Sequence, residues 1–186
     1  MAPIIPVTFR AGDVGTWRID RLDVVTGSSL AAASRLEVMP AAPLGAFDGA
    51  SWSLRGVSGH QRYVGLAEQR QLAEVQAGLG RRGASCAALI PIQKSDDWWS
   101  LAQDQRRAIF EDSSHHISAS LKYLPAIARR LYQSRELGEP FDFLTWFEYA
   151  PEHAALFEEL VVMLRATEEW TYVVREVDIR LSRGSP

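Results

Sequence analysis

The sequence has little cysteine and no long apolar segment, and both shortages narrow the possible functions. Cys86 is the only cysteine among the 186 residues. The chain therefore has no internal disulfide, no zinc site built from several cysteines and no iron–sulfur cluster held by its own thiolates. It also lacks the C-x-x-C-H sequence that attaches a c-type haem. No apolar run approaches the roughly 20 residues that a membrane-spanning helix needs.

Neither sign of charge is in large excess. The chain has 20 basic and 23 acidic residues, for a net charge of −3. A nucleic-acid-binding protein usually shows a basic excess or stripe, and none is visible. The first ten residues lack the basic start, apolar stretch and small-residue cleavage site of a signal peptide, so we expect a cytoplasmic protein. The length fits one domain, or two half-domains that share one core.

Several well-known catalytic and cofactor motifs are also missing. The sequence has no H-E-x-x-H, no G-x-S-x-G, no Walker phosphate-binding loop and no G-x-G-x-x-G. His60 and His153 are isolated, and Gly78 and Gly80 form only a weak glycine pair in an expected turn. The sequence therefore does not indicate a zinc protease, a serine hydrolase or a nucleotide-dependent enzyme.

The second half of the chain predicts the order strand, helix, strand, strand, helix, strand. The expected strands cover residues 86–92, 130–134, 141–149 and 173–181, and the expected helices cover 98–110 and 151–164. Strand 141–149 is largely apolar on both faces, which predicts cover on both sides. Strand 173–181 alternates apolar residues with Glu176, Asp178 and Arg180, which predicts one wet face. This element order is that of the ferredoxin-like fold.

The first half reads as a rougher copy of the second. We expect strands at residues 14–25 and 52–57 and helices at 28–36 and 61–73, with a loop or boundary in the Pro-, Ala- and Gly-rich stretch 38–49. The predicted fold is therefore α+β, with two ferredoxin-like βαββαβ halves, residues 1–80 and 81–186. These halves form one barrel-type structural unit that leaves room for a cavity between sheet and helices.

An insertion at residues 113–128 carries the most informative polar residues. His115 and His116 are adjacent, so on a helix they point about 100° apart and are poorly placed to ligate one metal together. The pattern alone favours a polar pair near a helix start. It also favours a solvated face for Glu168 and Glu169 and surface positions for arginines such as Arg129. The same residue types permit a haem pocket with an axial histidine, a carboxylate behind it and an arginine opposite, and spacing alone does not decide between these readings.

Four sequence blocks taken together resemble the chlorite dismutase family, and most closely its short branch. The blocks are K-S-D-D-W-W at residues 94–99, F-E-D-S-S-H-H-I-S-A-S-L-K-Y-L-P-A-I-A-R-R-L-Y at 110–132, F-D-F-L-T-W-F-E-Y-A-P at 141–151 and A-T-E-E-W-T-Y-V at 166–173. The similarity covers nearly the whole chain and is densest from residue 75 to 181. Each block alone would be a weak signal, whereas the combination is specific.

The resemblance implies a homodimer with one non-covalent haem b per subunit, held in the C-terminal half, that decomposes chlorite to chloride and dioxygen. His116 then matches the proximal iron ligand, and Arg129, thirteen positions later, matches the distal arginine. The acid that bonds the proximal imidazole matches Glu169, with Glu168 as a close rival. The other matched positions, on the distal side, at the haem edge or along the pocket wall, are Gln76, Lys94, Trp98, Tyr63, Leu124, Thr145 and Phe147.

Two other functions remain open at this level. Relatives of similar fold decarboxylate coprohaem, but they lack the distal arginine, so Arg129 favours chlorite breakdown. A haem-binding or haem-sensing protein without turnover is the other alternative, and such a protein would need no arginine over the iron.

Overall fold

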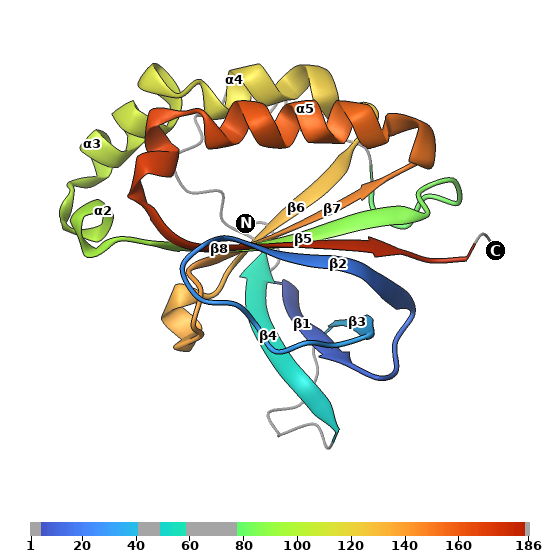
Figure 1. Ribbon diagram of the computed structural model, residues 1–186. Coiled ribbons are helices and arrows are strands. Elements are labelled where there is room, and N and C mark those ends of the chain that lie inside the picture. Colours follow the sequence, from blue (N-terminus) through green and yellow to red (C-terminus); the bar gives the residue numbers. More distant parts are fainter. Residues whose placement is uncertain (1–4, 41–48, 59–77, 185–186) are drawn as a thin grey trace.

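The computed structural model describes residues 5–40, 49–58 and 78–184, and within them one antiparallel sheet closes into a barrel (Figure 1). Around the barrel the strand order is β1-β3-β2-β8-β5-β7-β6-β4. The strands are β1 (Ile5–Gly12), β2 (Trp17–Thr26), β3 (Arg35–Pro40), β4 (Ala50–Ser58), β5 (Cys86–Lys94), β6 (Ala128–Gln133), β7 (Phe143–Tyr149) and β8 (Val173–Ser182). Mixed α+β architecture, expected from the sequence, is confirmed.

The strand order repeats itself. The first half contributes β4-β1-β3-β2 and the second half contributes β8-β5-β7-β6, so equivalent strands occupy equivalent places. A long β2–β8 pairing, from Arg18 opposite Ser182 to Thr26 opposite Glu176, joins the halves on one side. On the other side β4 meets β6 at the single pair Val57 and Gln133. Both halves therefore form one continuous sheet.

Helices α2 to α5 gather on one side of strands β5 to β8, while β1, β3 and β4 lie on the other side (Figure 1). None of the helices in the described ranges is long and apolar enough to cross a membrane. The helical segments are α2 (Asp96–Ser100), α3 (Gln103–Arg107), the π-helical η1 (Ala108–Ser113), α4 (His116–Ser120), η2 (Leu121–Tyr123), η3 (Arg135–Leu137), η4 (Pro151–His153), α5 (Ala154–Arg165) and η5 (Glu168–Tyr172).

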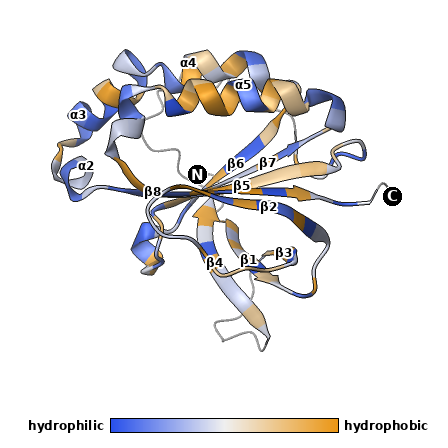
Figure 2. Cartoon of the chain, viewed as in Figure 1, coloured by the Kyte–Doolittle hydropathy of each residue, from blue (hydrophilic) through white to orange (hydrophobic). Residues whose placement is uncertain are grey.

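Strand β7 separates two apolar cores. Leu144 and Trp146 point into the barrel, where they pack with residues of both halves, such as Phe9. Phe147 points to the outer side and packs against Phe157 of α5. The apolar stripe of α5 thus covers the outer face of the sheet, and Figure 2 shows apolar residues along β5 beneath it. The prediction that this strand is covered on both sides is confirmed, as is its hairpin with β6.

The predicted wet face of strand 173–181 is wrong. Glu176, Asp178 and Arg180 are all buried, because α5 covers this face of β8. Arg165 of α5 reaches down between them, with Nη2 2.6 Å from Glu176 Oε1 and 2.8 Å from Asp178 Oδ2. Arg180 in turn pairs with Asp178 and with Glu158 of α5. Alternating charges look the same in a sequence whether they face water or each other.

Two predicted helices also differ from the structure. The expected helix 98–110 is interrupted between α2 and α3, because Leu101 and Ala102 have extended backbone, and α3 continues directly into the π-helical η1. Ser95 caps α2, as its Oγ accepts the Trp98 N–H. Residues 28–36 form no helix, and β3 begins at Arg35 instead. Strand β1 was not predicted. The expected helix 61–73 and most of the expected loop 38–49 lie outside the described residues.

Acid should weaken the ion pairs beneath α5. Burial alone would raise the pKa of Asp178, but the hydrogen bonds and charges of Arg180 and Arg165 outweigh it and lower that pKa below its usual value. The pKa of an aspartate in the unfolded chain is about 4. A carboxyl whose pKa is lowered by folding stabilises the fold fully above that pH, and this contribution is lost as the pH falls through the lower pKa of the folded state. Asp178→Asn should therefore lower the stability at pH 7 by about 3 kcal/mol, with a smaller difference from wild type at pH 3.

Thermal unfolding of both proteins between pH 7 and pH 3 measures this difference. Asp13→Asn, at an exposed position, is the matched control and should follow the wild-type curve. Parallel curves of Tm against pH for wild type and Asp178→Asn would contradict the prediction.

Candidate functional site

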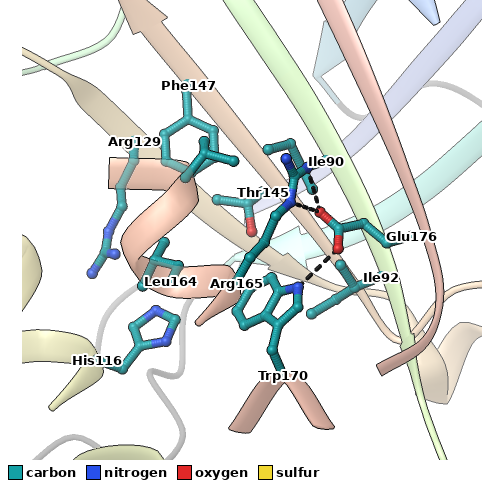
Figure 3. Close-up of a pocket in the computed structure, with 11 residues that line it drawn as sticks. Ile90, Ile92, His116, Arg129, Thr145, Phe147, Leu164, Arg165, Trp170 and Glu176 are labelled. Atoms are coloured by element: carbon teal, nitrogen blue, oxygen red, sulfur yellow. Dashed lines mark hydrogen bonds and ion pairs between the residues drawn. The ribbon is translucent and has the colours of Figure 1, made fainter. Parts of the chain in front are cut away.

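A cavity of about 420 Å³, measured with its open mouth, lies between the outer face of the sheet and the helices that cover it. Apolar side chains from β5, β7 and α5 form most of its wall, and a few polar groups enter from separate elements (Figure 3). Its lining residues are Ile90, Ile92, His116, Arg129, Thr145, Phe147, Val161, Leu164, Arg165, Trp170 and Glu176.

A chain of three polar side chains lies at one end of this cavity. His116 Nδ1 is 2.7 Å from Glu169 Oε2, and Lys94 Nζ is 2.8 Å from Glu169 Oε1. His116 begins α4, Glu169 lies in η5 and Lys94 ends β5, so three elements converge here. Lys94 and Glu169 are buried, at 3% and 5% exposure, and Lys94 also donates to the Glu169 carbonyl oxygen. Both carboxylate oxygens of Glu169 are therefore occupied.

The surroundings keep Glu169 ionised. Burial alone would raise its pKa, but the charges and hydrogen bonds of His116 and Lys94 lower that pKa to about 2. An ionised carboxylate only accepts hydrogen bonds, so His116 Nδ1 carries the shared hydrogen. In the neutral imidazole this leaves a lone pair on Nε2. A carboxylate placed in this way fixes the tautomer of a metal-binding histidine and strengthens it as a donor.

Arg129 of β6 extends toward the same space as His116 (Figure 3). Loss of solvent lowers the pKa of its guanidinium to about 10, and the Glu169 carboxylate partly opposes that change. Arg129 therefore stays a cation at neutral pH in a largely apolar cavity. A planar guanidinium in such surroundings attracts a small anion strongly.

Aromatic rings hold the imidazole of His116 in place. Phe110 stacks on it with ring centroids 4.5 Å apart, and Trp170 lies nearly parallel at 6.4 Å. Lys94 Nζ lies 4.4 Å from the ring centroid of the buried Trp98. The charged chain is thus surrounded by apolar surface, which strengthens its electrostatic interactions.

Of the other residues expected at the site, some line the cavity and others do not. Thr145 and Phe147 line the cavity, whereas Leu124 packs with Ile117 in a separate small cluster. Glu168 does not contact His116; it bonds the Ser113 hydroxyl instead. Glu169 is therefore the acid at the imidazole. Gln76 and Tyr63 lie outside the described residues.

Sequence reasoning missed Arg165 and Glu176 as cavity residues. Glu176 Oε2 accepts the indole N–H of Trp170 at 2.8 Å, and its Oε1 accepts from Arg165. This network connects the cavity wall to the ion pairs beneath α5. Nothing in the local sequence marks it, because it depends on α5 lying over β8.

Lys94 and Glu169 should be energetically coupled. Lys94→Met leaves the buried Glu169 carboxylate without its ammonium partner, which should reduce the free energy of unfolding by about 3 kcal/mol. Adding Glu169→Gln removes the uncompensated charge and should restore part of that loss. Urea unfolding of the wild type, both single variants and the double variant measures the coupling. Additive losses would show that the two side chains do not interact.

Comparisons with known proteins identify relatives of this chain by sequence and by fold. The family model described as chlorite dismutase matches residues 25–184. A curated relative, the chlorite dismutase of Ideonella dechloratans, is 28% identical over 149 residues, which cover 79% of this chain and 50% of the relative. The chain thus spans about half the length of that relative.

Solved structures extend the comparison. A dimeric chlorite dismutase from Nitrobacter winogradskyi is 63% identical, with a TM-score of 0.89 over 95% of this chain and 99% of that one. A mutant chlorite dismutase from Candidatus Nitrospira defluvii in complex with cyanide is 20% identical, with a TM-score of 0.63 over 96% and 90% of the two chains, and it supports the fold alone. Because the family model matches most of the sequence, the chain belongs to the chlorite dismutase family.

Proposed function

We propose that this protein decomposes chlorite to chloride and dioxygen with one non-covalently bound haem b per subunit. The observation that carries the proposal is the His116–Glu169 pair at a cavity into which Arg129 also extends. The family match and the 63% identical relative support the same activity. The reaction is balanced without a reductant, since one chlorite contains the atoms and the charge of one chloride and one dioxygen.

The residues of the cavity fit a haem. A haem supplies four iron ligands itself, so the protein needs to supply only one, and the Nε2 lone pair of His116 is suited to that role. The apolar wall formed by residues such as Ile90, Phe147 and Leu164 suits the faces of a macrocycle. When bound, the haem would supply a Lewis-acidic iron that accepts an oxygen atom of chlorite.

The protein's own side chains prepare the site for that chemistry. Glu169 holds the Nδ1 hydrogen of His116, so that Nε2 stays a strong donor, and Lys94 keeps Glu169 in place and ionised. Arg129 attracts chlorite by charge. It would then retain hypochlorite, the fragment left when one Cl–O bond of chlorite breaks, until the hypochlorite oxygen has joined the other oxygen as dioxygen and chloride remains. That retention would protect the protein from its own oxidant.

We also propose two features of the architecture and assembly, each on a separate observation. The repeated strand order supports two ferredoxin-like halves, residues 1–80 and 81–186, as one unit. The description of the Nitrobacter winogradskyi relative as dimeric supports a homodimer.

Loss of the His116 imidazole should abolish stable haem binding. His116→Ala removes the single protein ligand to the iron, so the Soret band of the reconstituted protein should disappear after gel filtration. His115→Asn is the matched control, because His115 is the exposed neighbour with φ of 51° and asparagine tolerates this backbone. An unchanged haem spectrum in His116→Ala would remove His116 from this role.

Loss of Arg129 should leave haem binding intact but shorten the working life of the enzyme. Without the cation, hypochlorite escapes and oxidises the haem and the protein, so the number of turnovers before inactivation should fall at least about tenfold. An oxygen electrode with repeated additions of chlorite measures this number for Arg129→Ala. Arg130→Ala, at the exposed neighbouring position, is the control. Equal turnover numbers for Arg129→Ala and wild type would contradict the proposed retention.

A further inference from the structure

Helix α4 begins with His116, and the residue at its N-cap position does not cap it with its side chain. It is five residues long, and the residue before it, His115, is in the left-handed conformation and makes no side-chain capping bond. The first N–H groups of a helix have no acceptor within the helix, so a buried helix start needs acceptors from elsewhere. The direction of the His116 side chain depends on how this first turn is held.

Glu111 supplies the missing acceptors. Its carboxylate is buried, at 8% exposure. Oε2 accepts the Ile117 N–H at 2.7 Å and Oε1 accepts the Ser118 N–H at 3.1 Å. The two bonded N–H groups follow His116 directly in the chain. One side chain thus accepts two successive N–H groups, and this pair of hydrogen bonds anchors the first turn.

The backbone around Glu111 has two uncommon features that bring its carboxylate to the start of α4. Glu111 lies in the π-helical η1, and η1 is followed within two residues by the left-handed His115. Single π-helical turns and non-glycine residues with positive φ are uncommon and concentrate at functional sites. Together they allow a carboxylate six residues before Ile117 to fold back onto the start of α4.

The same segment also holds the other parts of the site. Phe110, adjacent to Glu111, stacks on the imidazole of His116. Ser114 Oγ accepts the backbone N–H of Glu169 at 3.1 Å. One short segment therefore contacts both members of the His116–Glu169 pair.

We propose that Glu111 is a positioning residue that directs the His116 imidazole into the cavity by anchoring the first turn of α4. The inference rests on the proposed role of His116 as iron ligand. Glu111 itself neither lines the cavity nor touches the imidazole; it acts through the backbone of Ile117 and Ser118.

Three variants of the full chain test the proposal. Glu111→Gln keeps the shape but offers one acceptor oxygen in place of two, and Glu111→Ala removes both. Asp112→Asn, at the exposed neighbouring acid, is the control. The haem dissociation constant should rise about tenfold in Glu111→Gln, about a hundredfold in Glu111→Ala, and stay unchanged in Asp112→Asn. Circular dichroism and thermal unfolding without haem check that each variant is folded.

Resonance Raman spectra of the dithionite-reduced, haem-loaded proteins separate positioning from a general effect on stability. If Glu111 positions His116, the iron–imidazole stretching band should shift or broaden in Glu111→Gln, which is the variant most like wild type in shape. A band at the wild-type frequency in Glu111→Gln, or wild-type haem affinity in a folded Glu111→Ala, would overturn the proposal.

The His116→Ala variant distinguishes the two possible failures. If His116→Ala binds haem normally, the proposed function fails whatever the Glu111 variants show. If His116→Ala loses haem while the Glu111 variants behave like wild type, only the role of Glu111 is overturned.

Discussion

A carboxylate buried between an imidazole and an ammonium group determines the arrangement of the whole site. Removing Glu169 from water is costly, and the contacts with His116 and Lys94 offset that cost, with each partner within 2.8 Å of one carboxylate oxygen. Since the three residues belong to α4, η5 and β5, their contact also fixes where these elements meet. The imidazole is left with one nitrogen occupied and the other available, which is the state that an axial iron ligand needs.

The barrel provides a rigid support for this arrangement. Strand β7 fills the barrel interior with one face and meets α5 with the other, so the wall of the cavity is part of a continuous packed layer. Beneath α5, Arg165 joins Glu176 and Asp178, and Glu176 accepts the N–H of Trp170 beside His116. The cavity therefore lies between two polar networks, and Arg129 adds one cation on the strand next to β7.

Local patterns in the sequence indicated all four strands of the second half, and in the described part of the first half they indicated β2 and β4 but missed β1 and β3. Alternation in residues 141–149 and the proline at 151 indicated β7 and the start of the helical segment before α5, because these signals are local. The charged face of β8 was misread, since ion-paired and solvated charges share one pattern. The resemblance matched Glu169 to the acid beside the imidazole, with Glu168 as a rival, and the structure shows Glu169 in contact with His116. The proposed role of Glu111 depends on a π-helical turn that no local pattern indicates.

The most direct test of the central claim is the stoichiometry of the reaction. The purified protein would be saturated with haem b, chlorite would be added, and dissolved oxygen and chloride would be followed together. The account predicts one dioxygen and one chloride for each chlorite consumed, with no reductant added. Haem uptake without any release of oxygen would contradict it and would direct attention to coprohaem with peroxide as the next substrate.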